Sequence, residues 1–146
     1  TKARADLVDT FQMKEYDVIG VTIAFQLCEK VEVLTPTDSV NYLFAVLLET
    51  DYTLTMVKQA IIDKINGFNS DAMIGNECNP NTLASIIENE VEGVSTCRIV
   101  KYEDGSYTEI VEPISVEYNE LAQIDTTDIG SRIAVMSFNI DITLED

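Results

Sequence analysis

Residues 40–68 read VNYLFAVLLETDYTLTMVKQAIIDKINGF and contain the clearest strand and helix patterns of the chain. Residues 40–48 are almost all apolar, which is typical of a central strand that is covered on both faces. Apolar residues then recur at helical spacing, and Thr53 stands where an N-cap residue belongs. Gly67 stands where a left-handed residue would close the helix. The stretch therefore predicts a buried strand followed by an amphipathic helix.

A second amphipathic helix is predicted for residues 82–93, TLASIIENEVEG. Asn79 or Asn81 can cap it, Pro80 is tolerated in its first turn, and Gly93 ends it. Each helix has one apolar stripe, so we expect both stripes to pack on a sheet as one core. The predicted core residues are Leu54, Val57, Ile61, Ile65, Leu83, Ile86, Ile87 and Val91.

Strands are predicted on both sides of the helices. Residues 19–27 alternate between apolar and other side chains, and the phase continues through residues 31–33 until Pro36, which has no N–H to donate. After the helices, residues 94–102 and 107–118 are β-rich runs around the strong hairpin signal Asp-Gly.

The last predicted strand alternates clearly up to residue 144. Its inward side chains are expected to be Ala134, Met136, Phe138, Ile140, Ile142 and Leu144. We expect residues 18–27 and 133–144 to be edge strands, because the all-apolar run 40–48 should be central.

The predicted order β-β-α-(loop)-α-β-β-β indicates an α+β fold, with two amphipathic helices packed on one face of a mixed, mostly antiparallel β-sheet. Residues 1–16 have no clean period and are interpreted as an N-terminal arm or the end of an upstream segment. Residues 17–146 are expected to form a single α+β domain. The chain begins with Thr1, and we expect it to be a fragment of a larger subunit.

The charge of the chain limits its partners. It has 26 acidic and 9 basic residues, a formal net charge of −17. This field repels phosphate backbones and anionic lipids, so nucleic acid and membrane surfaces are not expected as partners. The apolar runs are far shorter than the ~20 residues of a membrane helix, and the N-terminus has no apolar signal-peptide core.

The sequence lacks the residues of the common catalytic sites. It has no histidine, which excludes a Ser-His-Asp hydrolase and a cysteine nucleophile with a histidine base. Cys28, Cys78 and Cys97 lack metal-ligand spacing and are expected to be reduced thiols. We therefore expect no enzyme, no catalytic, cofactor-binding or metal-binding residue, and no cofactor.

Acidic clusters are expected to be solvated surface rather than sites. Glu88, Glu90 and Glu92 alternate near a helix end, and Glu103 and Asp104 lie in a turn. Residues 125–128 could hold a hard cation, but they lack the EF-hand ligand pattern and are interpreted as a turn.

Several strings, taken in order, resemble the C-terminal region of baseplate J-like proteins, the wedge subunits of contractile phage tails. They are VEVLTPTDSV, YTLTMVKQAIIDKI, IGN, NTLASIIENEVEGVSTCRI and ISVEYNELAQID. The resemblance covers residues 31–129 and is supported mainly by the order and spacing of the strings. Glu92 stands where the family often has proline, and the first 30 residues have no counterpart.

The resemblance implies a structural component of a viral tail baseplate that mediates wedge assembly through subunit contacts, with a T-even type wedge subunit as a candidate parent. It implies protein subunits of the same assembly as partners, a homodimer within a larger complex, and location in the virion after assembly in the host cytoplasm. The alternatives are a small-ligand or carbohydrate-binding α+β module without catalysis, and an enzyme subunit of unrecognised type. An exposed apolar patch favours assembly, whereas a concave pocket with converging polar groups favours ligand binding.

Overall fold

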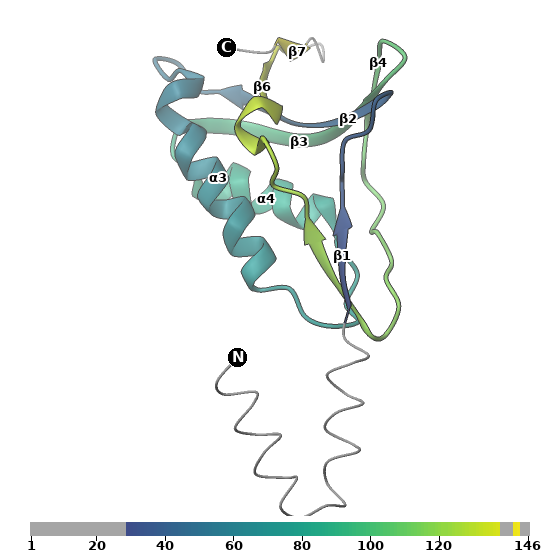
Figure 1. The fold of residues 1–146 in the computed structure, drawn as a ribbon. Coiled ribbons are helices and arrows are strands. Elements are labelled where there is room, and N and C mark those ends of the chain that lie inside the picture. The colour runs from purple at the N-terminus through teal and green to yellow at the C-terminus, as the bar shows by residue number, and fades with distance from the viewer. Residues whose placement is uncertain (1–28, 138–141, 144–146) are drawn as a thin grey trace, which may run out of the picture.

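The computed structural model describes residues 29–137 and 142–143 and has the expected α+β architecture (Figure 1). Helices α3 (Leu54–Ser70) and α4 (Pro80–Glu90) cover one face of a sheet with strand order β4-β3-β2-β6-β7. The strands are β1 (Glu29–Val33), β2 (Val40–Leu48), β3 (Val94–Glu103), β4 (Ser106–Glu109), β5 (Glu120–Ile124), β6 (Ile133–Met136) and β7 (Ile142–Thr143), and the 3-10 helix η1 spans Ile129–Arg132.

Strand β2 is central, as its composition predicts. It pairs antiparallel with β3 and parallel with β6. Phe44 and Val46 face the helices in the main core, while Leu43 and Ala45 belong to a smaller cluster with Met136 on the opposite face. All four of these β2 side chains are buried, so the prediction that both faces are covered is confirmed.

Helix α3 buries its predicted stripe but ends later than expected. The prediction that Gly67 closes the helix is wrong, because the helix continues to Ser70. Asn69 explains the extension: its side chain donates to the carbonyl oxygen of Ile124 (2.9 Å) and accepts from the N–H of the same residue (2.7 Å). Thr53 is the N-cap residue, but its side chain makes no capping hydrogen bond.

Asn79 caps helix α4 as predicted, since its side chain accepts a hydrogen bond from the N–H of Asn81 (3.0 Å). The prediction that Gly93 ends this helix is wrong, because the helix ends at Glu90. Leu83, Ile87 and Val91 are buried, and Val91 serves as the C-cap. The prediction that Ile86 joins the core is wrong, because it is only half-buried. The other seven predicted core residues of the two helices are buried.

The hairpin between β3 and β4 is confirmed. Asp104 and Gly105 form its two-residue turn with φ values of 53° and 79°, as a type I′ turn requires. The predicted strand 107–118 is too long, because β4 ends at Glu109. Pro113 has no N–H to donate, and within residues 110–118 Ile114 alone forms a β-bridge, with Cys78.

The expectation of one sheet is wrong for the first strand. β1 and β5 pair in parallel as a separate two-stranded sheet in the described part of the chain. The chain leaves β1 through Leu34, whose φ is 54°, so β1 does not run on into β2.

Residues 133–144 are predicted to form an edge strand. This is wrong for β6, which lies between β2 and β7, whereas β7 is the last strand in the sheet order. The other predicted edge, residues 18–27, lies outside the described residues, as do Phe138, Ile140 and Leu144. No helix in the described ranges is long and apolar enough to cross a membrane.

Candidate functional site

Acidic residues at the end of α4 connect neighbouring elements. Lys64 pairs with Glu90 at 2.9 Å, and Glu92 accepts a hydrogen bond from the Tyr52 hydroxyl (3.0 Å), which raises the pKa of Tyr52. Glu90 and Glu92 are exposed, as expected of a solvated surface. Glu88 differs, because it is half-buried and accepts a hydrogen bond from the backbone of β3 (3.1 Å).

The two cysteines in the described ranges are buried and free. Burial raises the pKa of Cys78 to about 11 and that of Cys97 to about 12, so both remain thiols at neutral pH. Cys78, which the sequence places in a polar loop, belongs to the main core. Cys28 lies outside the described residues.

Within residues 29–137 and 142–143, no three or more Cys, Asp and Glu side chains are grouped to hold a metal ion. Two larger hollows remain as candidate sites. One, which we call the apolar groove, lies beside β1 and the chain that follows β4 and has a volume of about 590 Å³. It is lined by Val33, Leu34, Tyr42, Lys101, Thr108, Glu109, Ile110, Val111, Glu112 and Ile114.

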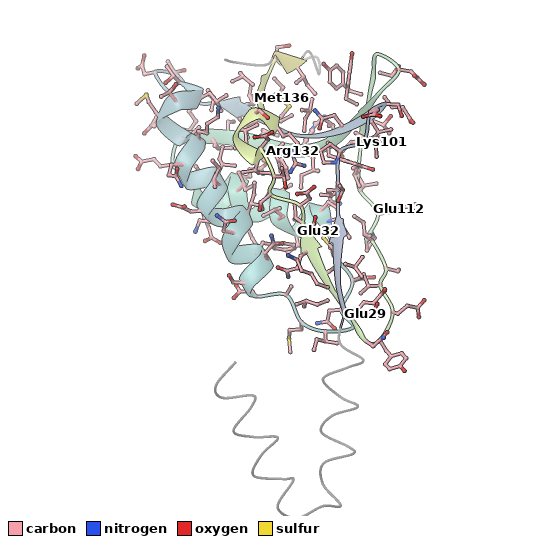
Figure 2. All side chains as sticks on the ribbon, in the orientation of Figure 1. Glu29, Glu32, Lys101, Glu112, Arg132 and Met136 are labelled. Atoms are coloured by element: carbon pink, nitrogen blue, oxygen red, sulfur yellow. The ribbon has the colours of Figure 1, made fainter. Side chains whose placement is uncertain are left out.

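The side chains of the apolar groove are mainly hydrophobic, and part of that surface is open. Val111 is 49% exposed, while Tyr42, Ile110 and Ile114 are partly buried against the main core. Figure 2 shows Glu112 on the extended segment after β4, with β1 on the other side of the groove. The groove is thus an open, mainly apolar surface that lies on the buried main core.

The groove adjoins two terminal strands. β4 is the last strand of the larger sheet, and β1 belongs to a sheet of two in the described structure. On β1 the carbonyl of Val33 accepts from the N–H of Asp125 on the β5 side (3.0 Å). Because backbone groups alternate along a strand, those of Lys30 and Glu32 point away from β5. β1 therefore presents hydrogen-bonding groups that a further strand could use.

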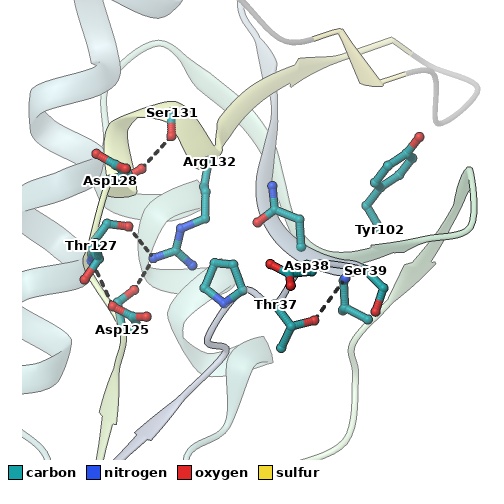
Figure 3. A pocket seen from close by; sticks show the side chains of 12 residues that line it. Thr37, Asp38, Ser39, Tyr102, Asp125, Thr127, Asp128, Ser131 and Arg132 are labelled. Carbon is teal, nitrogen blue, oxygen red and sulfur yellow. Dashed lines mark hydrogen bonds between the residues drawn. The ribbon is translucent and has the colours of Figure 1, made fainter.

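The second hollow, which we call the polar pocket, has a volume of about 600 Å³ (Figure 3). Three segments build it: the link between β1 and β2 together with the start of β2, the end of β3, and the loop from β5 through η1. Its lining residues are Pro36, Thr37, Asp38, Ser39, Val40, Asn41, Tyr102, Asp125, Thr127, Asp128, Ser131 and Arg132.

Arg132 joins the segments of the polar pocket. It is only 3% exposed, and its Nη1 donates to the carbonyl oxygen of Leu34 (3.0 Å). Its Nη2 donates to the carbonyl oxygens of Asp125 and Thr127 (3.2 Å for the latter). Its Nε is buried and has no hydrogen-bond partner in the described structure. Arg132 therefore ties the end of β5 to the chain that leaves β1.

Asp125 and Arg132 influence each other's ionisation. A hydrogen bond from the backbone N–H of Thr127 to the Asp125 carboxylate (2.9 Å) lowers the pKa of Asp125, and the charge of Arg132 adds to this against the opposing effect of burial. Burial lowers the pKa of Arg132, while Asp125 and Asp128 oppose this shift. An arginine remains charged throughout the physiological range.

Residues 125–128 form the predicted turn, in which Asp128 has a φ of 51°. Sequence reasoning missed Arg132, which organises this turn. One signal was present: Arg132 is the only basic residue after Lys101, and it precedes an apolar run. A single basic residue beside an apolar run and several acidic residues indicates an arginine that is buried and paired with acceptor groups.

Comparison with known proteins gives no relative: no protein-family model, curated protein or solved structure matches the chain.

Proposed function

We propose that this chain is a non-catalytic assembly module that joins subunits of a larger particle. We further propose that the particle is the tail baseplate of a contractile phage, with the chain located in the virion after assembly in the host cytoplasm. The setting rests on the ordered strings in residues 31–129 that resemble baseplate J-like proteins. The single observation that supports the assembly role is the apolar groove beside the terminal strands β1 and β4.

The groove suits an extended segment of another chain. Terminal strands offer backbone hydrogen bonds, and a neighbouring apolar hollow offers side-chain contacts that select the partner. Val111 and its neighbours supply that hollow, and the outward backbone groups of Lys30 and Glu32 supply the hydrogen bonds. The occupant that we propose is an extended segment with alternating apolar residues from a neighbouring subunit.

The net charge of the chain indicates which kind of subunit supplies this extended segment. The net charge of −17 makes copies of the chain repel one another, so a less acidic subunit is favoured as the source of the segment. The rim of the apolar groove also favours a less acidic partner. Lys101 is paired with Glu103 (3.3 Å) and Lys30 with Glu32 (3.6 Å), whereas the negative charge of Glu112 has no ion pair with a described residue. A homodimer, the arrangement that the resemblance implies, would have to overcome this repulsion with apolar contact.

The assembly role is tested by photocrosslinking in tails of the virus that encodes the chain. A benzophenone amino acid at Val111 should form an adduct with another tail subunit on irradiation, because this side chain is exposed in the groove. The same amino acid at Gln59, exposed on α3, serves as the matched control and should form none. Tails in which the Val111 position forms no adduct, or in which both positions react equally, would contradict the proposal.

A further inference from the structure

The polar pocket contains hydrogen-bonding groups that the described structure leaves unused. The carboxylates of Asp38 and Asp128 and the hydroxyl of Ser39 line it, and no hydrogen bond joins them to a described side chain or backbone group. Asn41 uses its Oδ1 to accept from the N–H of Tyr42 (2.8 Å), which leaves the Nδ2 donor.

Arg132 adds a donor of a different kind. Its two terminal nitrogens are engaged by carbonyl oxygens, while Nε is buried without an acceptor in the described structure. A buried donor without an acceptor is unfavourable, and a ligand oxygen that reached this nitrogen would satisfy it. The pocket therefore combines carboxylate acceptors with amide and guanidinium donors.

This combination selects a class of ligand. A simple cation could bind the carboxylates but could not accept from Asn41 or Arg132, and a simple anion would meet the charges of Asp38, Asp125 and Asp128. A hydroxyl group both donates and accepts, so a compound with several hydroxyls fits both sets of groups.

One aromatic side chain completes the pocket. Tyr102 lines it from β3 and is held beside Tyr107, with ring centroids 4.7 Å apart. Figure 3 shows the Tyr102 ring at the side of the pocket opposite Arg132. The apolar face of a sugar ring can pack on such an exposed aromatic ring while its hydroxyls bind polar groups.

We propose that the polar pocket binds a neutral saccharide. Asp38 and Asp128 accept hydrogen bonds from its hydroxyls, Asn41 donates to them, and Tyr102 packs against the ring face. The volume of about 600 Å³ lies within the range of about 300–1,000 Å³ that is usual for ligand sites. The pocket is preorganised, because Arg132 joins two of its segments and the Thr37 hydroxyl accepts from the N–H of Val40 (3.1 Å).

The test begins with the complete chain on an array of neutral oligosaccharides built from hexoses and N-acetylhexosamines. The strongest hit is then titrated into isotope-labelled protein, and the amide shifts are followed by NMR. We expect a dissociation constant of about 1 mM or lower, with the shifts concentrated at residues 36–41 and 125–132. Lysine amide and inorganic phosphate, titrated in the same way, should bind more weakly than the saccharide.

Two variants with matched controls locate the site. Tyr102→Ala should weaken binding about three- to tenfold, because the ring contact is lost, and Asp38→Asn should weaken it by a similar factor. Tyr118→Ala and Asp63→Asn remove an exposed tyrosine and an exposed carboxylate outside the pocket and should leave the affinity unchanged.

Three outcomes would overturn the proposal. The first is an array on which the parent protein binds no saccharide. The second is saccharide binding that Tyr102→Ala does not change, or shifts that lie outside the pocket. The third is tight binding of lysine amide alone, which would make the pocket a receptor for basic side chains.

Discussion

Arg132 is the residue on which the loop architecture most depends. It satisfies carbonyl oxygens from two separate segments, and its charge is shielded from water, since the side chain is 3% exposed. Removing one partner of such a network leaves buried polar groups unsatisfied, which is more costly than the loss of an exposed contact.

We predict that Arg132→Met lowers the free energy of unfolding by about 2–4 kcal/mol, because three carbonyl acceptors lose their donor while the packing volume is roughly kept. Arg98→Met is the control, since Arg98 forms an exposed ion pair with Glu109 (3.3 Å) and should cost under about 1 kcal/mol. Urea denaturation of the two variants measures both values. Equal losses of unfolding free energy would show that the hydrogen bonds of Arg132 do not stabilise the fold more than an exposed ion pair does.

Asp125 predicts a pH dependence. Its pKa is lower in the folded protein than in the unfolded chain, mainly through the hydrogen bond from Thr127. Its ionised form therefore stabilises the fold above the unfolded pKa of about 3.9, and this contribution disappears as the pH falls through the lower folded value. The gap in unfolding free energy between the parent and Asp125→Asn should be constant above about pH 5 and shrink towards pH 2. A gap that widens on acidification would contradict the assignment.

Two glycines have opposite effects on the helices and the turns that follow them. Gly93 has a φ of 96°, and a Cβ atom there would collide with the ring of Tyr52. Gly67 lies inside α3, and a Cβ atom there would meet nothing within 4 Å.

We predict that Gly93→Ala destabilises the protein by about 1–3 kcal/mol, because it adds steric conflict to a strained backbone. Gly67→Ala should instead stabilise it by about 0.5–1 kcal/mol, the usual gain from replacing glycine inside a helix. Thermal or urea unfolding measures both changes. Destabilisation by Gly67→Ala would mean that the helix closes at Gly67 after all.

The apolar stripes of the two helices predict which substitutions create a cavity in the core. Ile61 has no exposed surface, so Ile61→Ala should cost about 2–5 kcal/mol through lost burial and a residual cavity. Ile86 is only half-buried, and Ile86→Ala should cost under about 1.5 kcal/mol. If urea denaturation showed similar losses of unfolding free energy at the two positions, Ile86 would have to be part of the core.

The sequence-based predictions that held depend on local patterns. Spacing located both helices, the apolar run located β2, and Asp104-Gly105 located the hairpin, since each signal acts within a few residues. The predictions that were wrong depend on contacts between distant segments. Asn69 extends α3 by bonding to β5, 55 residues away, and no spacing rule contains that partner.

The division of the described strands into two sheets could not be predicted from the sequence. The parallel pairing of β1 with β5 joins residues about ninety positions apart, and only the folded chain brings them together. The same pairing places β1 beside the segment that follows β4 and so creates the apolar groove. The polar pocket was beyond sequence reasoning for the same reason, because Arg132 reaches Leu34 across 98 residues.

We propose that the apolar groove joins this chain to another subunit. Electron microscopy of the intact particle that contains the chain would show whether another subunit occupies the groove. We expect an extended segment of another chain in the groove, hydrogen-bonded to β1 or β4, within an interface that buries more than about 1,000 Å² in total. A particle in which the groove faces solvent and touches no other chain would show that the groove is not a subunit interface.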